Sequence, residues 1–549
     1  MNMEERYIAS VDLGTYKVAV CIARIQDQNV QVVYYKETPS QGIRNSYVLN
    51  TRKVENILRT ALTQAQQEMQ LKISQVVVGL PRYYVKQEPA TASIEREDED
   101  SQIQESELRA LKSEALKTYP LEDKKNEVIY GAVAQSFSTE ENFNEIESEI
   151  VGMTAGKLEG NFKVFIGSRR HSTNIDNIFN GMGMTIARKY FTPGITAKAV
   201  LKEEQMENGV ALIDLGAGVS SVTIFEGKIM RYYAAIPFGG NSITNDIKTE
   251  CGISTELAEN IKKGYGACLH DKLSSFGNKT LQINDDVDKT SIQVGVKYIS
   301  QIIDARMKEI IEALLYAIQS SGYSEKLRAG IVVTGGGVEM VNCVNFIKEV
   351  SGCMVSIGTP KPFFSCEGCP GVKSASAATT MGIIQAAKSD RSLNCTTKPV
   401  YTYSPKIAAP VQPKNAAPAP KPAAKPEIQP EPVLEQTAPV VEKASETAAA
   451  PAVEKEVKAV PEWFELPYVG PSEIPVKNSE APIEDTTVVG DETIEETGTE
   501  AQEPQFVPRR REKEKKDNSE KGVYKWFRNA TKKIQNYGKD LFDEMGEEV

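Results

Sequence analysis

Two short segments of the chain place an aspartate directly before a glycine-containing turn. The first is Asp12-Leu-Gly-Thr-Tyr-Lys17 and the second is Asp214-Leu-Gly-Ala-Gly218, and each follows an apolar run. Glycine lets backbone N–H groups approach a phosphate closely, and successive N–H groups form an anion-binding concavity. Either turn alone is usually structural. Together they predict a phosphate site lined by Gly14, Thr15, Lys17, Gly216, Ala217 and Gly218.

The two aspartates predict a metal ion beside that phosphate site. Phosphates held between two carboxylates need a divalent cation, and Mg²⁺ is usually bound through few carboxylates and several waters. Asp12 and Asp214 are therefore expected to hold Mg²⁺ through water. A third segment, Gly330–Gly337, reads as a buried strand that ends in three glycines. A nucleotide is the ligand that this combination favours.

The surrounding segments predict the elements that position these residues. Ile8–Ala23 reads as a strand, a turn and a strand, and its continuous apolar character is typical of a sheet covered on both faces. Apolar residues recur at helical spacing from Val54 to Met69, and Val76–Leu80 reads as a buried strand. Val210–Phe225 repeats the order of Ile8–Ala23 about 200 residues later, which predicts a duplicated α/β domain with a cleft between its halves.

Two further regions differ in character from this pattern. From Glu88 to about Lys163 the chain is polar and acidic, with one expected helix over Ser106–Lys117. A strand is expected to resume at Val164–Gly167, so the polar region reads as an inserted subdomain. Ser254–Leu327 is expected to be rich in helix.

Composition separates a linker and a tail from the body of this 549-residue chain. About nineteen of the 28 prolines lie between Cys395 and Arg509, among few large apolar residues, which is typical of a disordered linker. The net charge of −11 divides into about −4 for the body, −10 for the linker and +3 for the tail. A basic end on an acidic protein predicts an anionic surface as partner.

The tail pattern predicts an amphipathic helix over Lys521–Met545. Its apolar face comprises Val523, Trp526, Phe527, Ala530, Ile534, Tyr537, Leu541 and Met545. Basic residues flank this face, which favours a helix that lies on a membrane surface without spanning it. Packing on the protein's own core or on a partner is the alternative.

The first six residues are acidic and no window approaches eighteen apolar residues, so neither a secretory signal nor a membrane-spanning helix is expected. The protein is predicted to be cytoplasmic. Cys21, Cys251 and Cys343 stand in apolar runs and read as buried hydrophobic residues. Cys366 and Cys369 form a single Cys-x-x-Cys motif without a second ligand pair, which is more typical of two free thiols than of a zinc site.

The motifs resemble those of the actin–Hsp70–sugar kinase ATPases. The matching segments are Ile8–Ala23, Ala211–Phe225 and Gly330–Met340. Within that superfamily the chain is most similar to the FtsA family of bacterial cell-division proteins. Further matches to FtsA are Ile236–Asp246, Ala258–Gly266 and Val355–Pro360.

The resemblance implies an α/β fold of the actin type, in which duplicated ribonuclease H-like domains enclose an ATP cleft. With the composition, it predicts subdomain 1A (1–87 and 164–208), an inserted 1C subdomain (88–163), subdomain 2A (209–253 and, with closing helices, 330–395), subdomain 2B (254–329), a disordered linker (396–508) and a basic segment with an amphipathic membrane-targeting helix (509–549).

The resemblance also implies ligands and partners. Glu259 and Lys262 would hold the ribose of ATP, Gly335, Gly336 and Gly337 would pass beneath the adenine, and Mg²⁺ would accompany the phosphates. The tail of the division protein FtsZ would dock on Ser254–Leu327, copies of the chain would polymerise like actin, and the tail helix would anchor the assembly to the cytoplasmic face of the membrane at the division site. Other division proteins are expected as partners, and nucleic acid is not.

The second turn departs from the family pattern. Ala217, Val219 and Ser221 replace residues that usually include a threonine and an aspartate near the terminal phosphate. No water-positioning group is evident, so the chain is expected to be at most a slow ATPase. A sugar-kinase-like or chaperone-like ATPase, and an FtsA-like pilus-assembly protein, are the alternative functions.

Overall fold

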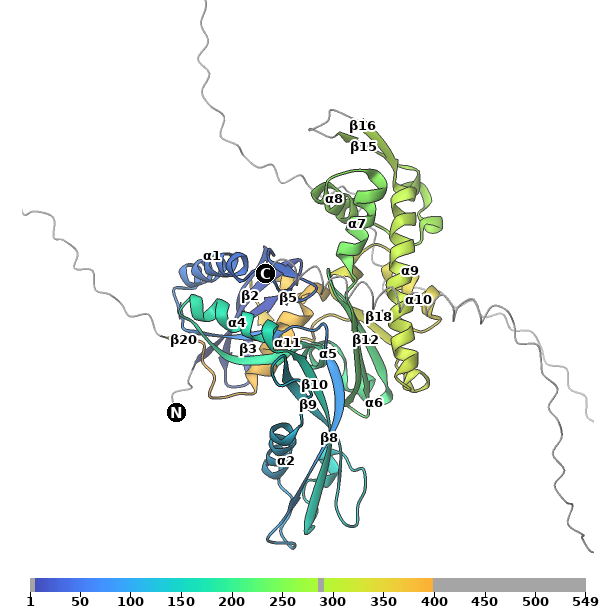
Figure 1. Ribbon diagram of the computed structural model, residues 1–549. Helices are drawn as coiled ribbons and strands as arrows, with labels where there is room; N and C mark the ends of the chain where they lie inside the picture. The colour runs from blue at the N-terminus through green and yellow to red at the C-terminus, as the bar shows by residue number, and fades with distance from the viewer. Residues whose placement is uncertain (1–4, 285–290, 398–549) are drawn as a thin grey trace, which may run out of the picture. The chain divides into compact units, whose positions relative to one another are not determined.

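The computed structural model describes residues 5–284 and 291–397 (Figure 1). The predicted linker and tail helix, including Trp526, Phe527, Ile534, Leu541 and Met545, lie outside the described residues. In the part of the chain that is described, no helix has the length and hydrophobicity needed to cross a membrane.

The first half is built on a six-stranded sheet. Its order is β11-β7-β1-β2-β3-β19, with bounds Thr185–Phe191, Gln75–Leu80, Arg6–Leu13, Lys17–Gln26, Asn29–Pro39 and Ser365–Cys366. Strands β1, β2 and β3 are antiparallel neighbours, whereas β7 and β11 run parallel to β1. Ile8 to Val11 are all buried, as the apolar run predicted, because helices cover both faces of the sheet. The helices pair as α1 (Thr51–Met69) with α4 (Arg169–Gly181), and α5 (Thr192–Val200) with α11 (Ala378–Lys388).

The second half repeats this topology in a five-stranded sheet. Its order is β14-β13-β12-β17-β18, with bounds Ile229–Ile236, Ser220–Glu226, Val210–Leu215, Ile331–Thr334 and Val355–Ile357. Three antiparallel strands are again followed by parallel ones. The predicted α/β class and its duplication are confirmed, and the chain has the actin-like fold.

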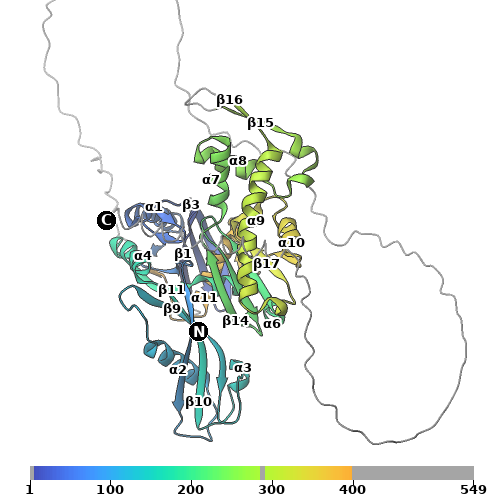
Figure 2. The ribbon, with the colours of Figure 1, turned by 45° about the vertical axis from the view of Figure 1, so that its right-hand side comes forward.

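The polar region inserted in the first half forms a separate three-stranded sheet. Its order is β8-β10-β9, with bounds Lys86–Glu95, Lys157–Ser168 and Glu127–Ser138. Helix α2 (Glu105–Thr118) is the predicted helix and packs across this sheet (Figure 2), and the short helix α3 (Glu147–Ile150) precedes β10. The strand expected at Val164–Gly167 is the end of β10, which begins earlier. Its first part alternates buried and more exposed residues and so lacked an apolar run.

The small sheet is fastened to the outer strand of the second half. The Tyr233 backbone N–H donates to the Gln87 side chain at 3.1 Å, and the Gln135 amide donates to the Met230 carbonyl at 3.0 Å. The Lys163 ammonium donates to the carbonyl of Arg231. These side chains satisfy polar groups along β14 that no neighbouring strand pairs, which protects a sheet edge.

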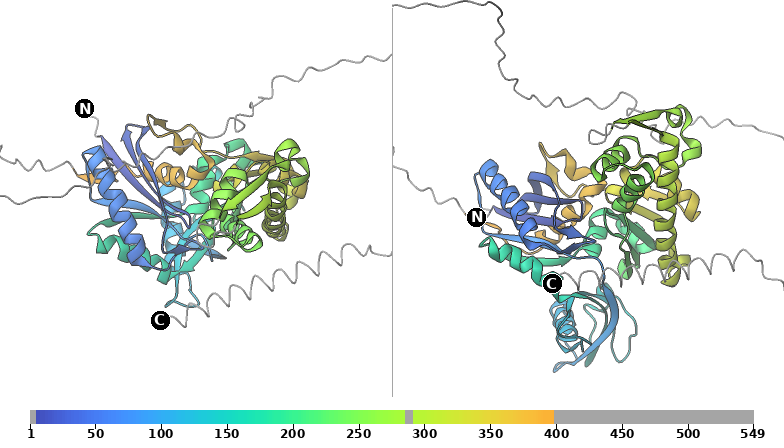
Figure 3. Two further views of the ribbon diagram at one scale, coloured as in Figure 1. Left: turned by 90° about the horizontal axis from the view of Figure 1, so that it is seen from above. Right: turned by 45° about the horizontal axis from the view of Figure 1, so that its top comes forward.

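The region Ser254–Leu327 contains the predicted helices, α8 (Thr255–Tyr265) and the long α9 (Val296–Ser320). Helix α9 packs along the second sheet and against α7 (Gly240–Cys251), as the yellow-green helix in Figure 3 shows. A β-hairpin, β15 (Thr280–Asn284) and β16 (Ser291–Gly295), was not predicted.

The remaining elements are short. They are β4 (Ile43–Arg44), β5 (Tyr47–Val48), β6 (Lys72–Ile73), α6 (Glu203–Asn208), α10 (Cys343–Ser351), β20 (Thr396–Thr397) and six 3₁₀ turns among the described residues, of which Gly336–Glu339 follows β17.

The cysteines fall into the two predicted groups, buried core residues and a Cys-x-x-Cys pair. Cys21, Cys251 and Cys343 are buried with free thiols, which confirms them as core residues. Cys366 and Cys369 are partly exposed, also with free thiols.

Candidate functional site

The two glycine turns have the same backbone geometry. The Gly14 N–H donates to the Lys17 carbonyl at 3.0 Å, and the Gly216 N–H donates to the Val219 carbonyl at 3.1 Å. A Cβ at Gly14 would lie 2.7 Å from that Lys17 oxygen, and one at Gly216 would lie 2.6 Å from that Val219 oxygen. Glycine is therefore required at both turns because a side chain would collide with the hydrogen-bonded backbone.

The turns face each other across the boundary between the halves. A Cβ at Gly218 would lie 2.8 Å from both the Oγ1 and the Cγ2 atom of Thr15. Within the described residues, the backbone N–H groups of Thr15, Tyr16, Ala217 and Gly218 have no hydrogen-bond acceptor. Unpaired N–H groups on two facing turns form the kind of concavity that binds anions.

The first carboxylate, Asp12, lies at the end of β1. Its Oδ2 atom accepts a hydrogen bond from the Thr380 hydroxyl on α11 at 3.2 Å. Burial raises the pKa of Asp12 above its ordinary value, against the opposing effect of Arg82 and then of Lys17. A partly screened, buried carboxylate of this kind favours a nearby cation.

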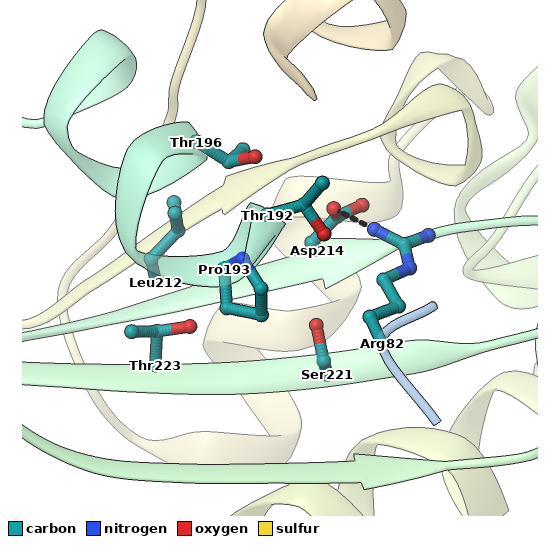
Figure 4. A pocket seen from close by; sticks show the side chains of 8 residues that line it. All are labelled: Arg82, Thr192, Pro193, Thr196, Leu212, Asp214, Ser221 and Thr223. Carbon is teal, nitrogen blue, oxygen red and sulfur yellow. Dashed lines mark hydrogen bonds and ion pairs between the residues drawn. The ribbon is translucent and has the colours of Figure 1, made fainter. Parts of the chain in front are cut away.

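The second carboxylate, Asp214, is 8% exposed and forms an ion pair with Arg82. Figure 4 shows the Arg82 side chain reaching from the first half toward Asp214 on the second. The Arg82 Nη2 atom also lies 3.4 Å from the Val219 carbonyl oxygen. Burial is the largest single influence and lowers the pKa of Arg82, but the charges of Asp214, Tyr233 and Asp12 and the hydrogen bond to Asp214 together outweigh it, so the net pKa is raised.

Arg82 is held at its backbone as well as at its side chain. Its N–H donates to the Ser46 hydroxyl at 3.0 Å, and its carbonyl accepts from the Tyr233 hydroxyl. The Ser46 N–H donates in turn to Oγ1 of Thr15 at 3.2 Å. The first turn, Arg82 and the second turn therefore form one connected set of contacts.

Arg82 was not predicted from the sequence, although a signal for it exists. It follows β7, which runs parallel to β1 with Val11 beside Val78. The carboxyl ends of parallel strands meet at one edge of a sheet, so Arg82 is brought near Asp12. That argument requires the pairing of β1 with β7, which the sequence does not show.

A cavity of about 10 Å³ lies beside the Arg82–Asp214 pair (Figure 4). It has room for about one water molecule. Its polar lining includes Thr192 and Thr196 of α5 and Ser221 of β13. Ser221 pairs directly with Asp214 across the strands, at the position where the family pattern led us to expect an aspartate.

The predicted ribose residues form a network beside the second turn. The Lys262 ammonium lies 2.6 Å from Oε2 of Glu259 and donates to the Gly240 carbonyl at 2.9 Å. Burial lowers the pKa of Lys262, against the opposing effect of Glu259. The Gly240 N–H donates to the Gly216 carbonyl at 3.0 Å, so the network and the turn are adjacent.

The three glycines lie against the end of β12. Gly335 has φ +89°, and a Cβ there would lie 2.5 Å from Oδ1 of Asp214. A Cβ at Gly337 would lie 2.8 Å from the Leu215 side chain. By contrast, the nearest atom to a Cβ at Gly336 is 3.8 Å away, on Ser376, so Gly336 borders open space.

The structure therefore brings together most of the predicted nucleotide residues. Lys17 differs from the rest because its ammonium forms an ion pair with Glu37 of β3. Among residues 5–284 and 291–397, no group of three or more His, Cys, Asp or Glu side chains could hold a metal ion by itself.

Comparisons with known proteins point to one family. A family model described as "Cell division protein FtsA" matches residues 211–382. The chain is 27% identical to the cell division protein FtsA of Neisseria meningitidis over 70% of this chain and 91% of that protein. It is 25% identical to FtsA of Bacillus subtilis over 70% of this chain and 84% of that protein. The predicted resemblance to FtsA is confirmed.

Among solved structures, the chain is similar to one described as a "PilM-PilN type IV pilus biogenesis complex". The TM-score is 0.48 at 12% identity, over 69% of this chain and 98% of that chain. A TM-score below 0.5 carries no weight for function.

Proposed function

We propose that this chain, whose body resembles FtsA, is an actin-fold cell-division protein that binds ATP with Mg²⁺ between its two facing turns. The observation that carries the proposal is the pair of equivalent turns, each following an aspartate and each with N–H groups that have no acceptor among the described residues, which lie against each other at Thr15 and Gly218. One turn holds a phosphate weakly, whereas two facing turns can hold a chain of phosphates.

The residues present fit that ligand. The N–H groups of Thr15, Tyr16, Ala217 and Gly218 would bind the phosphates, with Gly14 and Gly216 permitting the turns. Glu259 and Lys262 would hold the ribose, and Gly335, Gly336 and Gly337 would border the adenine.

Mg²⁺ would be held through water by Asp12 and Asp214, and it would neutralise phosphate charge. Burial raises the pKa of Asp12 because its charge is only partly compensated, which suits a carboxylate that faces a cation. Asp214 would exchange part of its contact with Arg82 for the hydrated ion.

Slow turnover is part of the proposal. Val219 is buried, and Ser221 pairs with Asp214 and lines a cavity with room for about one water. Neither side chain is a base, so neither can take a proton from an attacking water as the aspartate of the family pattern could. ATP would serve chiefly to set the state of the body for self-assembly, with hydrolysis below the range of about 1–100 s⁻¹ typical of kinases.

We infer the cellular role from the similarity to cell division proteins, from what the FtsA resemblance implies and from the tail sequence. The chain would polymerise, bind the FtsZ tail through Ser254–Leu327, meet other division proteins, and anchor the FtsZ ring to the cytoplasmic face of the membrane during septum formation. Trp526, Phe527, Ile534, Leu541 and Met545 would enter the interface, with basic residues beside anionic lipid.

Calorimetry with ATP and Mg²⁺ tests the nucleotide site. Gly336→Asp should abolish binding, because the new carboxylate enters open space near the ligand and leaves the fold intact. Gly252→Asp is a control, since a Cβ there meets no atom within 4 Å and Gly252 lies at the far end of α7. Its φ of +64° is one that Asp tolerates better than most residues. Equal affinity in wild type and Gly336→Asp would show that the nucleotide does not bind here.

Vesicle flotation tests the anchor. Replacing Trp526 and Phe527 with Glu removes apolar area and adds charges that anionic lipids repel, so flotation should be lost while ATP binding remains. Equal flotation of wild type, the double variant and a chain ending at Pro508 would rule out the tail as anchor.

A further inference from the structure

The Arg82–Asp214 ion pair joins the two halves at the point where the proposed ligand would sit. Arg82 comes from the first half, at the end of β7, and Asp214 comes from the second, at the end of β12. The Arg82 side chain is 20% exposed, so it lies at the surface of the site and can reach a ligand there. An ion pair in this position must change when a polyphosphate and a divalent cation arrive, because both partners are then offered stronger counter-ions.

The guanidinium of Arg82 lies beside Gly216 of the second turn. A Cβ at Gly216 would lie 2.3 Å from Nη2 of Arg82, so the guanidinium lies against the Cα of this glycine. The carbonyl of the same residue accepts from Gly240, whose own carbonyl binds Lys262. Arg82 therefore contacts Gly216 directly, whereas Lys262 is linked to Gly216 only through Gly240. The two cations come from different halves of the molecule.

This placement separates the two ends of a nucleotide. Glu259, Lys262 and the three glycines mark the nucleoside end on the second half, so the phosphates must extend from there toward the first half. Arg82 is the cation that the first half contributes directly at the second turn. Lys17, the other cation near Asp12, is paired with Glu37.

We propose that Arg82 is the residue that recognises the terminal phosphate of the nucleotide, and that Asp214 holds it in position until the nucleotide and Mg²⁺ bind. This inference rests on the proposed function. A planar guanidinium binds phosphate oxygens with two parallel hydrogen bonds, which lysine cannot do. On binding, Asp214 turns to the hydrated Mg²⁺ and Arg82 turns to the terminal phosphate, so no buried charge is left alone. The site then distinguishes a nucleoside triphosphate from a diphosphate.

Calorimetry with ATP and with ADP, each with Mg²⁺, tests this on the full chain. Arg82→Ala should weaken ATP binding roughly ten- to a hundredfold, as for a lost hydrogen bond to a charged group, and should change ADP binding less than about threefold. Arg82→Lys keeps the charge but not the fork, so it should show a smaller loss for ATP alone. Arg306→Ala is the matched control, because it removes an Arg–Asp pair of the second half, with Asp246, away from the turns.

A second measurement uses no nucleotide. Without Arg82, Asp12 and Asp214 lack their shared counter-ion, so Mg²⁺ alone should raise the melting temperature of Arg82→Ala and leave that of the wild type nearly unchanged. If Arg82→Ala does not fold, the ratio of ATP affinity to ADP affinity in Arg82→Lys tests the role of Arg82: the ratio should fall below that of the wild type, and an unchanged ratio would overturn the role.

The outcomes are separable. An equal loss for ATP and ADP, or no loss for either, would overturn the role of Arg82 while the nucleotide site stands. Failure of the wild type to bind either nucleotide would overturn the proposed function and this inference with it.

Discussion

The two glycine turns share one backbone and differ in charge. Each closes a hairpin of the same register, with Asp12 opposite Ala19 and Asp214 opposite Ser221. Asp214 has an arginine as partner, whereas Asp12 has the neutral hydroxyl of Thr380 and only more distant cations. A duplicated fold therefore supplies two turns with equivalent backbones, and residues outside the duplication give them different charge partners.

This difference assigns distinct tasks to the turns. The second turn is already neutralised without a ligand, so its contribution depends on displacing or redirecting Arg82. The first retains a carboxylate that more distant cations compensate only in part, and a nearby cation would stabilise it. Under the proposed function, Mg²⁺ and a polyphosphate bound together would provide counter-ions for both turns.

The largest expected effect comes from neutralising each aspartate. Asp214→Asn leaves Arg82 without its counter-ion and should lower the free energy of unfolding by roughly 2–4 kcal/mol, less than for a fully buried pair because Arg82 is 20% exposed. Asp12→Asn removes a poorly compensated charge and keeps an oxygen for Thr380. It should raise stability by on the order of 1 kcal/mol.

Urea unfolding without nucleotide measures both changes. If both variants lowered the free energy of unfolding, or both raised it, the proposed difference in charge between the two turns would be wrong.

The next effect concerns the glycines. Gly14→Ala places a Cβ against the Lys17 carbonyl, and Gly216→Ala places one against both the Val219 carbonyl and the Arg82 guanidinium. Both should destabilise by about 1–3 kcal/mol, with Gly216→Ala the worse. Thermal melts rank the two variants, and Gly295→Ala, where a Cβ meets no atom within 4 Å and φ is −72°, controls for the loss of a glycine without a collision.

A smaller effect is the pH dependence of Asp12. Its pKa is higher in the folded state than in the unfolded chain, so its ionisation destabilises the fold at neutral pH. Its favourable contribution is fully present below the unfolded pKa of about 4 and is lost as the pH rises through the folded pKa.

The stability gap between wild type and Asp12→Asn should therefore be largest at pH 7 and should close toward pH 4. A gap that widens on acidification would reverse the assignment of Asp12.

The smallest effect is expected at Lys17. Its pair with Glu37 is partly exposed, at 18% and 38%, so Lys17→Met should change stability by less than about 1 kcal/mol. ATP affinity should also change little, because the ammonium is engaged away from the turn. A tenfold loss of affinity would show that Lys17 leaves Glu37 to bind phosphate, and the first turn would then also depend on a displaced cation.

The parts of the fold that the sequence predicts are those encoded locally. An apolar run, an aspartate and a glycine determine a hairpin within about fifteen residues, so both turns and β17 could be predicted. Helix α2 was predicted from its own periodicity. The first part of β10 was missed because one of its faces is polar, and the β15–β16 hairpin because short strands among helices give a weak signal.

The parts of the site that could not be predicted depend on distant pairing. Arg82 reaches Asp214 only because β7 lies beside β1 and the two halves meet. The pairing of Lys17 with Glu37 depends likewise on β3 lying beside β2.

Hydrogen exchange of the backbone amides tests most directly whether a nucleotide binds between the turns. Exchange is followed by mass spectrometry on the full chain, with and without ATP and Mg²⁺, in peptides that cover 12–18, 214–220 and 335–340. The backbone N–H groups of Thr15, Tyr16, Ala217 and Gly218 have no acceptor among the described residues, and the three glycines would border the adenine, so all three peptides should become protected together when ATP is added. Gly336→Asp should abolish that protection. Saturation with ATP that protects only one of the two turns, or neither, would contradict a site formed by the pair.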